Sequence, residues 1–393
     1  MDMPDAWRLG LIATSNGSPR PLLANAMHAL RVAPQWRGVL AFNGFALRTI
    51  AAKTTPWGFS GEWSEQQDAL TAEWLHHAGI FVSLDVVARA IDTVANENSF
   101  HPIRAYLDGI RWDGIPRIDT WLPRYAGAED TPYARATGSK WLISAVARIR
   151  EPGCKADHVL IIEGPQALGK STMIRTLGQE FYTDDIADLG SKDSAMQVQG
   201  AWIIELPELD SLARSEMSRI KAFITRASDR FRPPYGHRVI ETPRQCVFAG
   251  TVNHSNYLRD ETGGRRFWPV ECRRIDIESL GRDRDQIWAE SQYRYSTGES
   301  WWITDDVVIH NAVDEQAARY EGDPWEHLIT EWAESREVVT IEQILMHCLE
   351  KPRAQWSQAD KNRISRCLRC LGWERYQQRI GEAREWRYRR TIR

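Results

Sequence analysis

Val159-Leu160-Ile161-Ile162-Glu163 runs directly into Gly164-Pro165-Gln166-Ala167-Leu168-Gly169-Lys170-Ser171 near the middle of this 393-residue sequence. The first part is a short continuous apolar run, which predicts a strand that is buried on both faces. The second part matches the pattern G-x-x-x-x-G-K-[ST] at every fixed position, and residues of helical composition follow it up to Glu180. Strand, glycine-rich loop and helix in this order predict a phosphate-binding loop in an α/β core with a parallel sheet.

The chemistry of such a loop needs glycines, because backbone N–H groups must wrap around phosphate oxygens. The dipole of the following helix adds positive potential at its N-terminus. We expect Lys170 to reach the β- and γ-phosphates of ATP, and the Ser171 hydroxyl to ligate Mg²⁺. The predicted nucleotide contacts are Gly164, Pro165, Gln166, Ala167, Leu168, Gly169, Lys170, Ser171 and Thr172.

Two further apolar runs, at residues 201–204 and 245–250, predict the other central strands. Glu205 ends the first of them, and we predict it as the Mg²⁺-side carboxylate. Glu208 is a candidate for polarising the attacking water, and Asp210 is a third carboxylate that leaves the identity of the base open. Asn253 follows the last strand and is predicted to sense the γ-phosphate, unless its amide only bonds its own backbone in a turn.

Arg265 and Arg266 follow the glycine pair at residues 263–264. Paired arginines on a glycine hinge can swing planar, permanently charged guanidinium groups toward a phosphate. Such an arginine finger acts on the site of a neighbouring subunit, so this prediction implies a homo-oligomer. The alternative is a structural ion pair with Asp260 or Glu261.

The length predicts two or three domains, and 42% hydrophobic residues are enough to form their cores. The sequence holds no apolar stretch of about 18 residues and no signal-peptide pattern at its start, so we expect a cytoplasmic protein without a membrane partner. The six scattered cysteines predict reduced thiols. Cys367 and Cys370 form a lone C-x-x-C, which we interpret as helix cysteines because no second pair or nearby His completes a zinc site.

Four segments are predicted from the periodicity of apolar residues: a helical N-terminal region at 1–97, a helical collar at 98–156, a P-loop NTPase core at 157–310 and a basic winged-helix-like domain at 311–393. The helices expected in the first two segments cover residues 22–30, 66–79, 86–96 and 132–150.

The C-terminal segment is basic, with 13 Lys or Arg against 4 Asp or Glu between Lys351 and Arg393. Three helices, at residues 325–335, 341–350 and 358–371, precede two alternating strands around Gly381, which is a winged-helix arrangement. Trp386 and Tyr388 are expected to face inward. Such units bind DNA through the third helix and the wing, or serve as protein contacts. The predicted nucleic-acid contacts here are Arg366, Arg369, Arg387 and Arg389.

Several further blocks resemble one family. They are Ser99-Phe100-His101-Pro102, Trp112-Asp113-Gly114, Pro152-Gly153-Cys154-Lys155, Glu205-Leu206-Pro207-Glu208-Leu209-Asp210, Arg232-Pro233-Pro234-Tyr235-Gly236, Thr251-Val252-Asn253 and Gly264-Arg265-Arg266-Phe267-Trp268-Pro269-Val270. Over residues 98–270 the chain resembles the virulence-associated E family, P-loop proteins of phages and genomic islands that are grouped beside superfamily 3 helicases. Family members often have a glycine at the position of Ala167, but the required glycines are intact and we expect nucleotide binding.

The resemblance implies a replication-type ATPase or DNA helicase of a mobile element. It also implies a hexameric ring of identical subunits that acts on single-stranded or forked DNA, with primase as a partner. In superfamily 3 motors a hairpin between the second and third strands projects into the ring channel and grips DNA. The matching candidates are Arg232, His237 and Arg238, unless they belong to a solvated loop.

Two other functional classes fit parts of the pattern. A nucleotide-gated switch or loader would use the same motifs to arrange partners without unwinding DNA. A small-molecule kinase is disfavoured, because the sequence offers no lid-like acceptor site and carries an additional basic segment.

Overall fold

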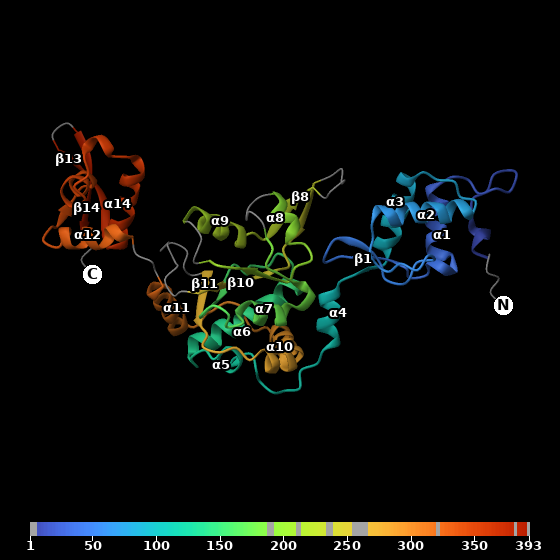
Figure 1. The fold of residues 1–393 in the computed structure, drawn as a ribbon, viewed down its shortest axis with the longest axis horizontal. Helices are drawn as coiled ribbons and strands as arrows, with labels where there is room; N and C mark the ends of the chain where they lie inside the picture. The colour runs from blue at the N-terminus through green and yellow to red at the C-terminus, as the bar shows by residue number, and fades with distance from the viewer. Residues whose placement is uncertain are drawn as a thin grey trace.

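The computed structural model describes residues 6–186, 192–209, 214–232, 239–253, 266–319, 323–380 and 383–390. Three parts follow one another along its long axis (Figure 1). An N-terminal unit of residues 6–100 lies at one end, a parallel sheet covered by helices lies in the middle, and a C-terminal unit of residues 323–390 lies at the other end. None of the described helices is long and apolar enough to cross a membrane.

The N-terminal unit packs three helices on a small sheet. The helices are α1 (Leu23–Val32), α2 (Glu65–His77) and α3 (Leu84–Glu97), and the strands, in sheet order, are β3 (Gly61–Glu62), β2 (Arg48–Ala51), β1 (Leu40–Asn43) and β4 (Ser99–Phe100). The three predicted helices are confirmed, but the prediction of a helical region missed the sheet. Its strands are two to four residues long, too short to show the alternation that identifies a strand in a sequence.

Three helices lead into the sheet: α4 (Pro102–Gly109), α5 (Trp121–Ala126) and α6 (Pro132–Arg150). The bounds of α6 agree with the prediction, and its start has a physical cause. The Thr131 hydroxyl accepts the N–H of Ala134 at 3.1 Å, and Pro132 occupies the first turn. Trp141 of α6 is fully buried, and its Nε1 donates to the Phe248 carbonyl at 2.8 Å, which ties the helix to the sheet.

The central sheet has five strands in the order β11-β5-β10-β7-β6, and all neighbouring pairs are parallel. The strands are β5 (Val159–Glu163), β6 (Tyr182–Thr183), β7 (Ile203–Leu206), β10 (Val247–Val252) and β11 (Phe267–Glu271), and the helices of this part are α7 (Lys170–Gly178), α8 (Lys192–Gln197), α9 (Arg214–Ile224), α10 (Ile277–Ser296) and α11 (Asp306–Ala318). The predicted α/β architecture with a parallel sheet is confirmed.

Both faces of the sheet are buried, which explains the continuous apolar run in β5. Leu160 and Ile162 belong to a core that they share with α5, α6, α7 and α10. Val159 and Ile161 point to the other face and pack in a core with α9. Successive side chains of a strand point to opposite faces, so a strand between two helical layers is apolar throughout.

Between β7 and β10 the chain forms a β-hairpin. Its strands are β8 (Ser228–Phe231) and β9 (Ile240–Pro243), which pair antiparallel. Its base is fixed by the buried ion pair of Arg244 and Asp229, with atoms 2.5 Å apart. The expected hairpin is therefore present. Arg232 is exposed directly after β8, whereas the predicted residues His237 and Arg238 lie outside the described residues.

The C-terminal unit combines helices with a three-stranded antiparallel sheet of order β12-β14-β13. Its elements are α12 (Pro324–Ala333), β12 (Val338–Val339), α13 (Ile341–Gln343), α14 (Gln358–Cys370), β13 (Trp373–Ile380) and β14 (Ala383–Arg390). Thr340 and Ser357 form capping boxes and start the second and third helices where they were expected. The second helix is shorter than predicted: after α13 the chain continues as a π-helical turn over Ile344–Cys348.

The two aromatic residues of β14 differ in burial. Tyr388 is completely buried against the helices, but 48% of Trp386 is exposed. The prediction that Trp386 faces the core was therefore wrong. Trp386 lies two residues nearer the hairpin end, where Arg375 covers its ring at 3.9 Å instead of a helix.

Candidate functional site

The predicted nucleotide-site residues meet at one edge of the central sheet. Strands β5, β10 and β7 are parallel neighbours, so their carboxyl ends lie side by side. The loop of residues 164–169, called here the glycine loop, leaves β5 at this edge and enters α7. Glu205 lies near the end of β7, and Asn253 follows β10. Strand order thus places the third predicted strand between the other two.

Glu205 is the centre of a hydrogen-bonded network. Its side chain is buried, and Oε1 accepts the Ser171 and Thr251 hydroxyls, each at 2.7 Å. Oε2 accepts the hydroxyl of Tyr182 at 2.5 Å. Burial and the hydrogen bond to Glu205 raise the pKa of Tyr182 above its ordinary value, so Tyr182 stays protonated and donates. Four elements, α7, β6, β7 and β10, therefore orient one carboxylate.

The donor set fits a magnesium ion held partly by phosphate. A hydroxyl and a carboxylate are hard oxygen ligands, and Mg²⁺ in phosphate sites takes one or two protein ligands and fills its remaining positions with phosphate and water. Ser171 and Glu205 could provide these two ligands, since their oxygens already lie 2.7 Å apart. Among the described residues there is no cluster of three His, Cys, Asp or Glu that would hold a metal without phosphate.

Lys170 is directed into the glycine loop. Its side chain is buried, and Nζ donates to the carbonyls of Gly164 at 2.7 Å and Pro165 at 3.0 Å. A third hydrogen bond, also 3.0 Å long, joins Nζ to Oδ1 of Asn253. Lys170 and Asn253, the residue that was predicted to sense the γ-phosphate, are thus in direct contact although they lie 83 residues apart in the sequence.

The backbone of the glycine loop explains two of its glycines. Gly169 has a φ of +96°, a conformation that strains any residue with a side chain. At Gly164 a Cβ atom would meet the Cys272 carbonyl oxygen at 2.7 Å. Ala167 also has a positive φ, +66°, and this is the position at which a glycine was expected from the family resemblance.

Other predicted residues have less defined surroundings. Glu208 is exposed in the turn after β7 with a φ of +49°, while Asp210 lies outside the described residues. The geometry therefore leaves the choice of the base open. Thr172 is exposed in the first turn of α7.

Two residues near the site were not predicted from the sequence. Tyr182 belongs to a two-residue strand without a motif, and the Nε atom of Arg319 donates to Glu163 at 2.6 Å beside the glycine loop.

Arg266 lies at the amino ends of the sheet strands, whereas the glycine loop lies at their carboxyl ends. It precedes β11, whose first residue Phe267 pairs with Val159, the first residue of β5. The loop follows the last residue of the five-residue β5. Arg266 is thus six residue steps from the start of the loop, which at a rise of about 3.3 Å per residue is roughly 20 Å along the strand. Arg266 therefore does not reach the glycine loop of its own chain.

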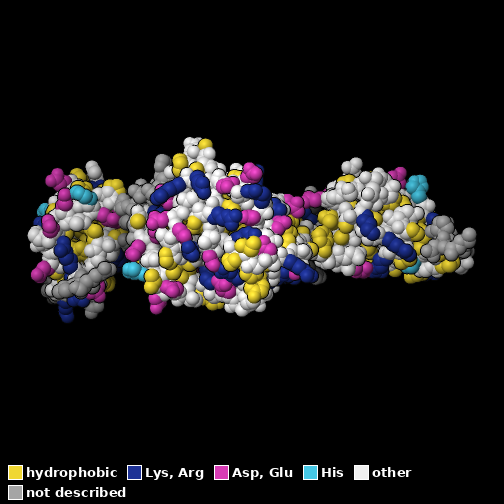
Figure 2. All heavy atoms as spheres, turned by 90° about the horizontal axis from the view of Figure 1, so that it is seen from below, with side chains coloured by type: hydrophobic (Ala, Val, Ile, Leu, Met, Phe, Trp, Pro, Cys, Tyr) yellow, Lys and Arg dark blue, Asp and Glu magenta, His cyan; other side chains and the backbone are white. Residues whose placement is uncertain are grey.

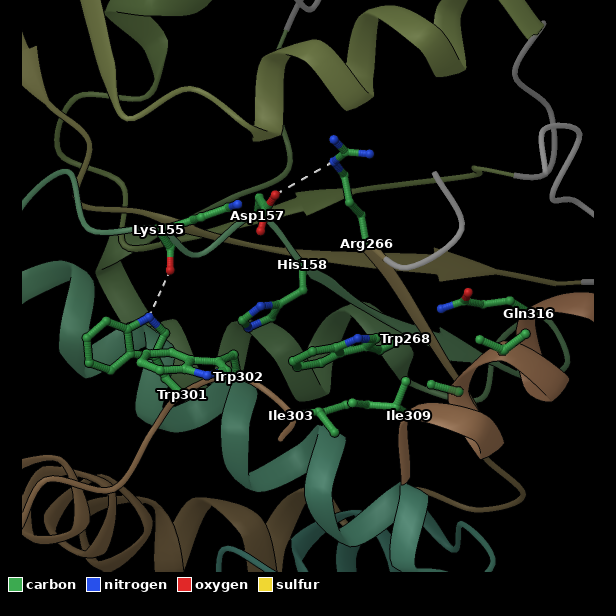
Figure 3. A pocket seen from close by; sticks show the side chains of 12 residues that line it. Lys155, Asp157, His158, Arg266, Trp268, Trp301, Trp302, Ile303, Ile309 and Gln316 are labelled. Carbon is green, nitrogen blue, oxygen red and sulfur yellow. Dashed lines mark hydrogen bonds and ion pairs between the residues drawn. The ribbon is translucent and has the colours of Figure 1, made fainter. Parts of the chain in front are cut away.

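The side chain of Arg266 makes two contacts at this edge. Its Nε lies 3.8 Å from Asp157 Oδ2 and 3.2 Å from the Thr225 hydroxyl oxygen. Figure 3 shows Arg266 directed toward Asp157 at the rim of a pocket of about 690 Å³. The proposed partners Asp260 and Glu261, and the second candidate Arg265, lie outside the described residues.

The pocket itself was not predicted. Trp301 and Trp302 line one side, and the ring of Trp268 stacks on His158 with centroids 3.8 Å apart. Burial, with a smaller contribution from the positive charge of Arg148, lowers the pKa of His158 to about 3, so this imidazole is neutral at physiological pH. Lys155, Arg266 and Trp268 belong to the blocks that carry the family resemblance, but no local pattern indicates that they meet Trp301 and Trp302 in one pocket.

A family model described as the virulence-associated protein E-like domain matches residues 107–321. The chain belongs to this family. The predicted family resemblance is thereby confirmed. The matched range contains the glycine loop, Glu205, Asn253 and Arg266, and it includes neither the N-terminal unit nor the C-terminal unit.

Solved structures similar to this virulence-associated E-like protein include chains of the NrS-1 C-terminal region. One apo structure of this region, residues 305–718, has a TM-score of 0.45 and 13% identity, and an A-form apo structure has a TM-score of 0.46 and 12% identity. Each comparison covers 90% of this chain and 96% of the other. No curated protein matches the sequence.

The predicted nucleic-acid contacts of the virulence-associated E-like protein fall into separate groups. Arg387 and Arg389 form ion pairs with Glu385 and Glu374, at 2.8 and 2.9 Å. Arg366 and Arg369 instead line a hollow with Arg375, a residue that was not predicted. Figure 2 shows acidic and basic side chains interspersed over the middle part of the face that it displays, so charge marks no single nucleic-acid surface there.

Proposed function

We propose that this chain is an ATP-hydrolysing P-loop NTPase that acts on DNA, as a ring-forming helicase in the replication of a phage or mobile element. The observation that carries this proposal is the meeting of Lys170 with Asn253 and of Ser171 with Glu205 at one sheet edge. Lysine and serine of a glycine loop next to a carboxylate and an amide on neighbouring strands are the parts that phosphoryl transfer from Mg·ATP requires.

Each residue has a separate task in hydrolysis. Backbone N–H groups of the glycine loop and Lys170 bind the phosphates; Ser171 and Glu205 would hold Mg²⁺, which would supply positive charge against the phosphate oxygens. Glu208 or Asn253 orients the water that attacks the γ-phosphorus as the bond to ADP breaks. Tyr182 and Thr251 keep the Glu205 carboxylate in place.

The remaining parts of the proposal concern the assembly. Because Arg266 lies at the sheet edge away from its own glycine loop, it is suited to act on the site of a neighbouring copy, as in a hexameric ring. The hairpin β8–β9 with Arg232 is suited to contact single-stranded or forked DNA in the channel. The winged-helix-like C-terminal unit is a second DNA contact, and a primase is the expected partner.

The test is ATP hydrolysis by the wild-type chain and Lys170→Ala, with and without single-stranded DNA, at two salt concentrations. We expect hydrolysis that DNA stimulates, more strongly at low salt, and that the substitution abolishes. Hydrolysis that DNA does not change would favour a nucleotide-gated switch or loader. Transfer of phosphate to a metabolite instead of water would favour a kinase, and no hydrolysis under any condition would contradict the proposal.

A further inference from the structure

Six arginines of the C-terminal unit fall into two classes. The first class is neutralised by carboxylates. Its members are Arg363 with Asp323 at 2.7 Å, Arg387 with Glu385 at 2.8 Å and Arg389 with Glu374 at 2.9 Å. A further carboxylate of the unit, Asp360, pairs with Lys351 at 2.6 Å.

The second class consists of Arg366, Arg369 and Arg375, which line one hollow of about 380 Å³ together with Asn362 and Ser365. Within the described part of the chain, none of these three arginines has a carboxylate within ion-pair distance. The Nε atom of Arg366 is buried and has no hydrogen-bond partner among the described residues. This donor faces neither solvent nor an acceptor.

Strand register separates the members of the two classes that lie on the hairpin. Arg375 pairs with Tyr388 across the hairpin, so both side chains lie on the same face of the sheet. That face meets α14, because Tyr388 is buried and its hydroxyl donates to Ser365 Oγ at 2.8 Å. Arg387 pairs with Tyr376 and therefore points to the other face. The hollow thus lies between α14 and the hairpin.

Three positive charges around one hollow repel each other, and this repulsion is strongest where water is partly excluded. The arrangement is stabilised when an anion enters. Guanidinium groups match the oxygen geometry of phosphate and bind it with paired hydrogen bonds, more strongly than neutral donors do. The Cζ atom of Arg375 already lies over the ring of Trp386, 3.9 Å from its centroid, so less side-chain freedom is lost on binding.

We infer that this hollow is a phosphate site for a nucleic-acid strand, in which Arg366, Arg369 and Arg375 bind one backbone phosphate and the half-exposed Trp386 contacts an adjacent base. The ring decides for a nucleic acid over a free anion, because a base stacks on an aromatic side chain next to an arginine site. The inference rests on the proposed action on DNA. In it, Arg375 joins Arg366 and Arg369 as a nucleic-acid contact, and the predicted contacts Arg387 and Arg389 are left out.

The experiment measures binding of a fluorescently labelled single-stranded oligonucleotide to the full chain by anisotropy, without ATP. Arg366→Gln, Arg369→Gln and Arg375→Gln should each weaken binding about 10-fold, as expected for a lost charged hydrogen bond. Each should also reduce the slope of log K against log salt by about 0.7. Arg387→Gln and Arg389→Gln remove the same charge and should bind within about 2-fold of wild type. Thermal unfolding of all five variants checks that they are folded.

Two outcomes would overturn the inference. An equal loss in all five variants would mean diffuse attraction without a built site. The second outcome is that pyrophosphate stabilises the wild-type chain but not Arg375→Gln, while both proteins bind the oligonucleotide equally well. This result would mean that the hollow is an anion site that does not bind nucleic acid. Both proteins carry Lys170→Ala in this measurement, so that pyrophosphate binding at the glycine loop does not contribute. Failure of the proposed function is read separately, as absent ATP hydrolysis in the wild-type chain.

Discussion

The Ser171 hydroxyl donates a 2.7 Å hydrogen bond to Oε1 of Glu205, which lies 34 positions later in the chain. The contact exists because β10 lies between β5 and β7, so the first turn of α7 faces the end of β7. The same carboxylate accepts Thr251 and Tyr182. A residue on which four elements converge is a sensitive place to test the proposed chemistry.

Glu205→Gln should leave ATP binding nearly unchanged and reduce kcat by about 100-fold or more, because a neutral amide offers magnesium one weaker ligand and faces the hydroxyl donors with its NH₂ group. Steady-state hydrolysis and binding of a fluorescent ATP analogue separate the two effects. Tyr182→Phe is the matched milder variant: it keeps the ligand and removes one orienting bond, with an expected loss of about 10-fold in magnesium affinity or rate. Hydrolysis of Glu205→Gln within 2-fold of wild type would exclude Glu205 as the magnesium-side carboxylate.

Gly169→Ala adds one methyl group to the glycine loop and Ala167→Gly removes one, and the two changes should affect stability and ATP binding differently. At Gly169, with a φ of +96°, a Cβ adds strain of about 1–3 kcal/mol. At Ala167, with a φ of +66°, removing the Cβ relieves about 1 kcal/mol, which the entropy of the unfolded glycine largely offsets. Thermal unfolding and ATP titration should therefore show a clear loss for Gly169→Ala and little change for Ala167→Gly. Equal losses would contradict the observed loop conformation.

The stability of the central part should fall as the pH drops below 6.5, in part because of His158. In the folded chain the pKa of His158 is lowered to about 3 from its ordinary value of 6.5, so the unfolded chain binds one proton more between these values. The stabilising contribution is complete above pH 6.5 and is lost as the pH falls, by about 2 kcal/mol at pH 5.

Urea unfolding at pH 7 and pH 5 checks this prediction. His158→Phe keeps a ring against Trp268 but cannot be protonated, so its urea midpoint should fall less between the two pH values than that of the wild type. The same decrease in both proteins would show that other groups cause the acid sensitivity.

Arg266→Ala and Lys170→Ala should each abolish hydrolysis alone and restore part of it when mixed. Mixed oligomers would contain interfaces with an intact glycine loop on one copy and an intact arginine on its neighbour. The measurement is ATPase activity against mixing ratio, with each variant alone as the control. Absence of activity in every mixture, with both variants folded, would indicate that Arg266 only stabilises its own chain through Asp157 and Thr225.

Local sequence determined the glycine loop, the strand that precedes it and the helix α6. These features have causes within a few residues: a glycine pattern that permits positive φ, an apolar run of strand length, and Thr131 with Pro132 at a helix start. The starts of α13 and α14 were predictable for the same reason, since a capping box spans only four residues.

Only the tertiary structure decided which of these residues meet. Strand order brought Ser171 to Glu205 and Lys170 to Asn253. It also brought in Tyr182, which no motif indicates, and placed Arg266 at the opposite ends of the strands from the glycine loop. Hairpin register placed Arg375 at the hollow and Arg387 on the opposite face of the sheet, and the helices leave Trp386 half exposed. The physical reason is that chain composition sets which conformation a segment prefers, whereas contacts between distant side chains depend on how strands are ordered and which face each residue occupies.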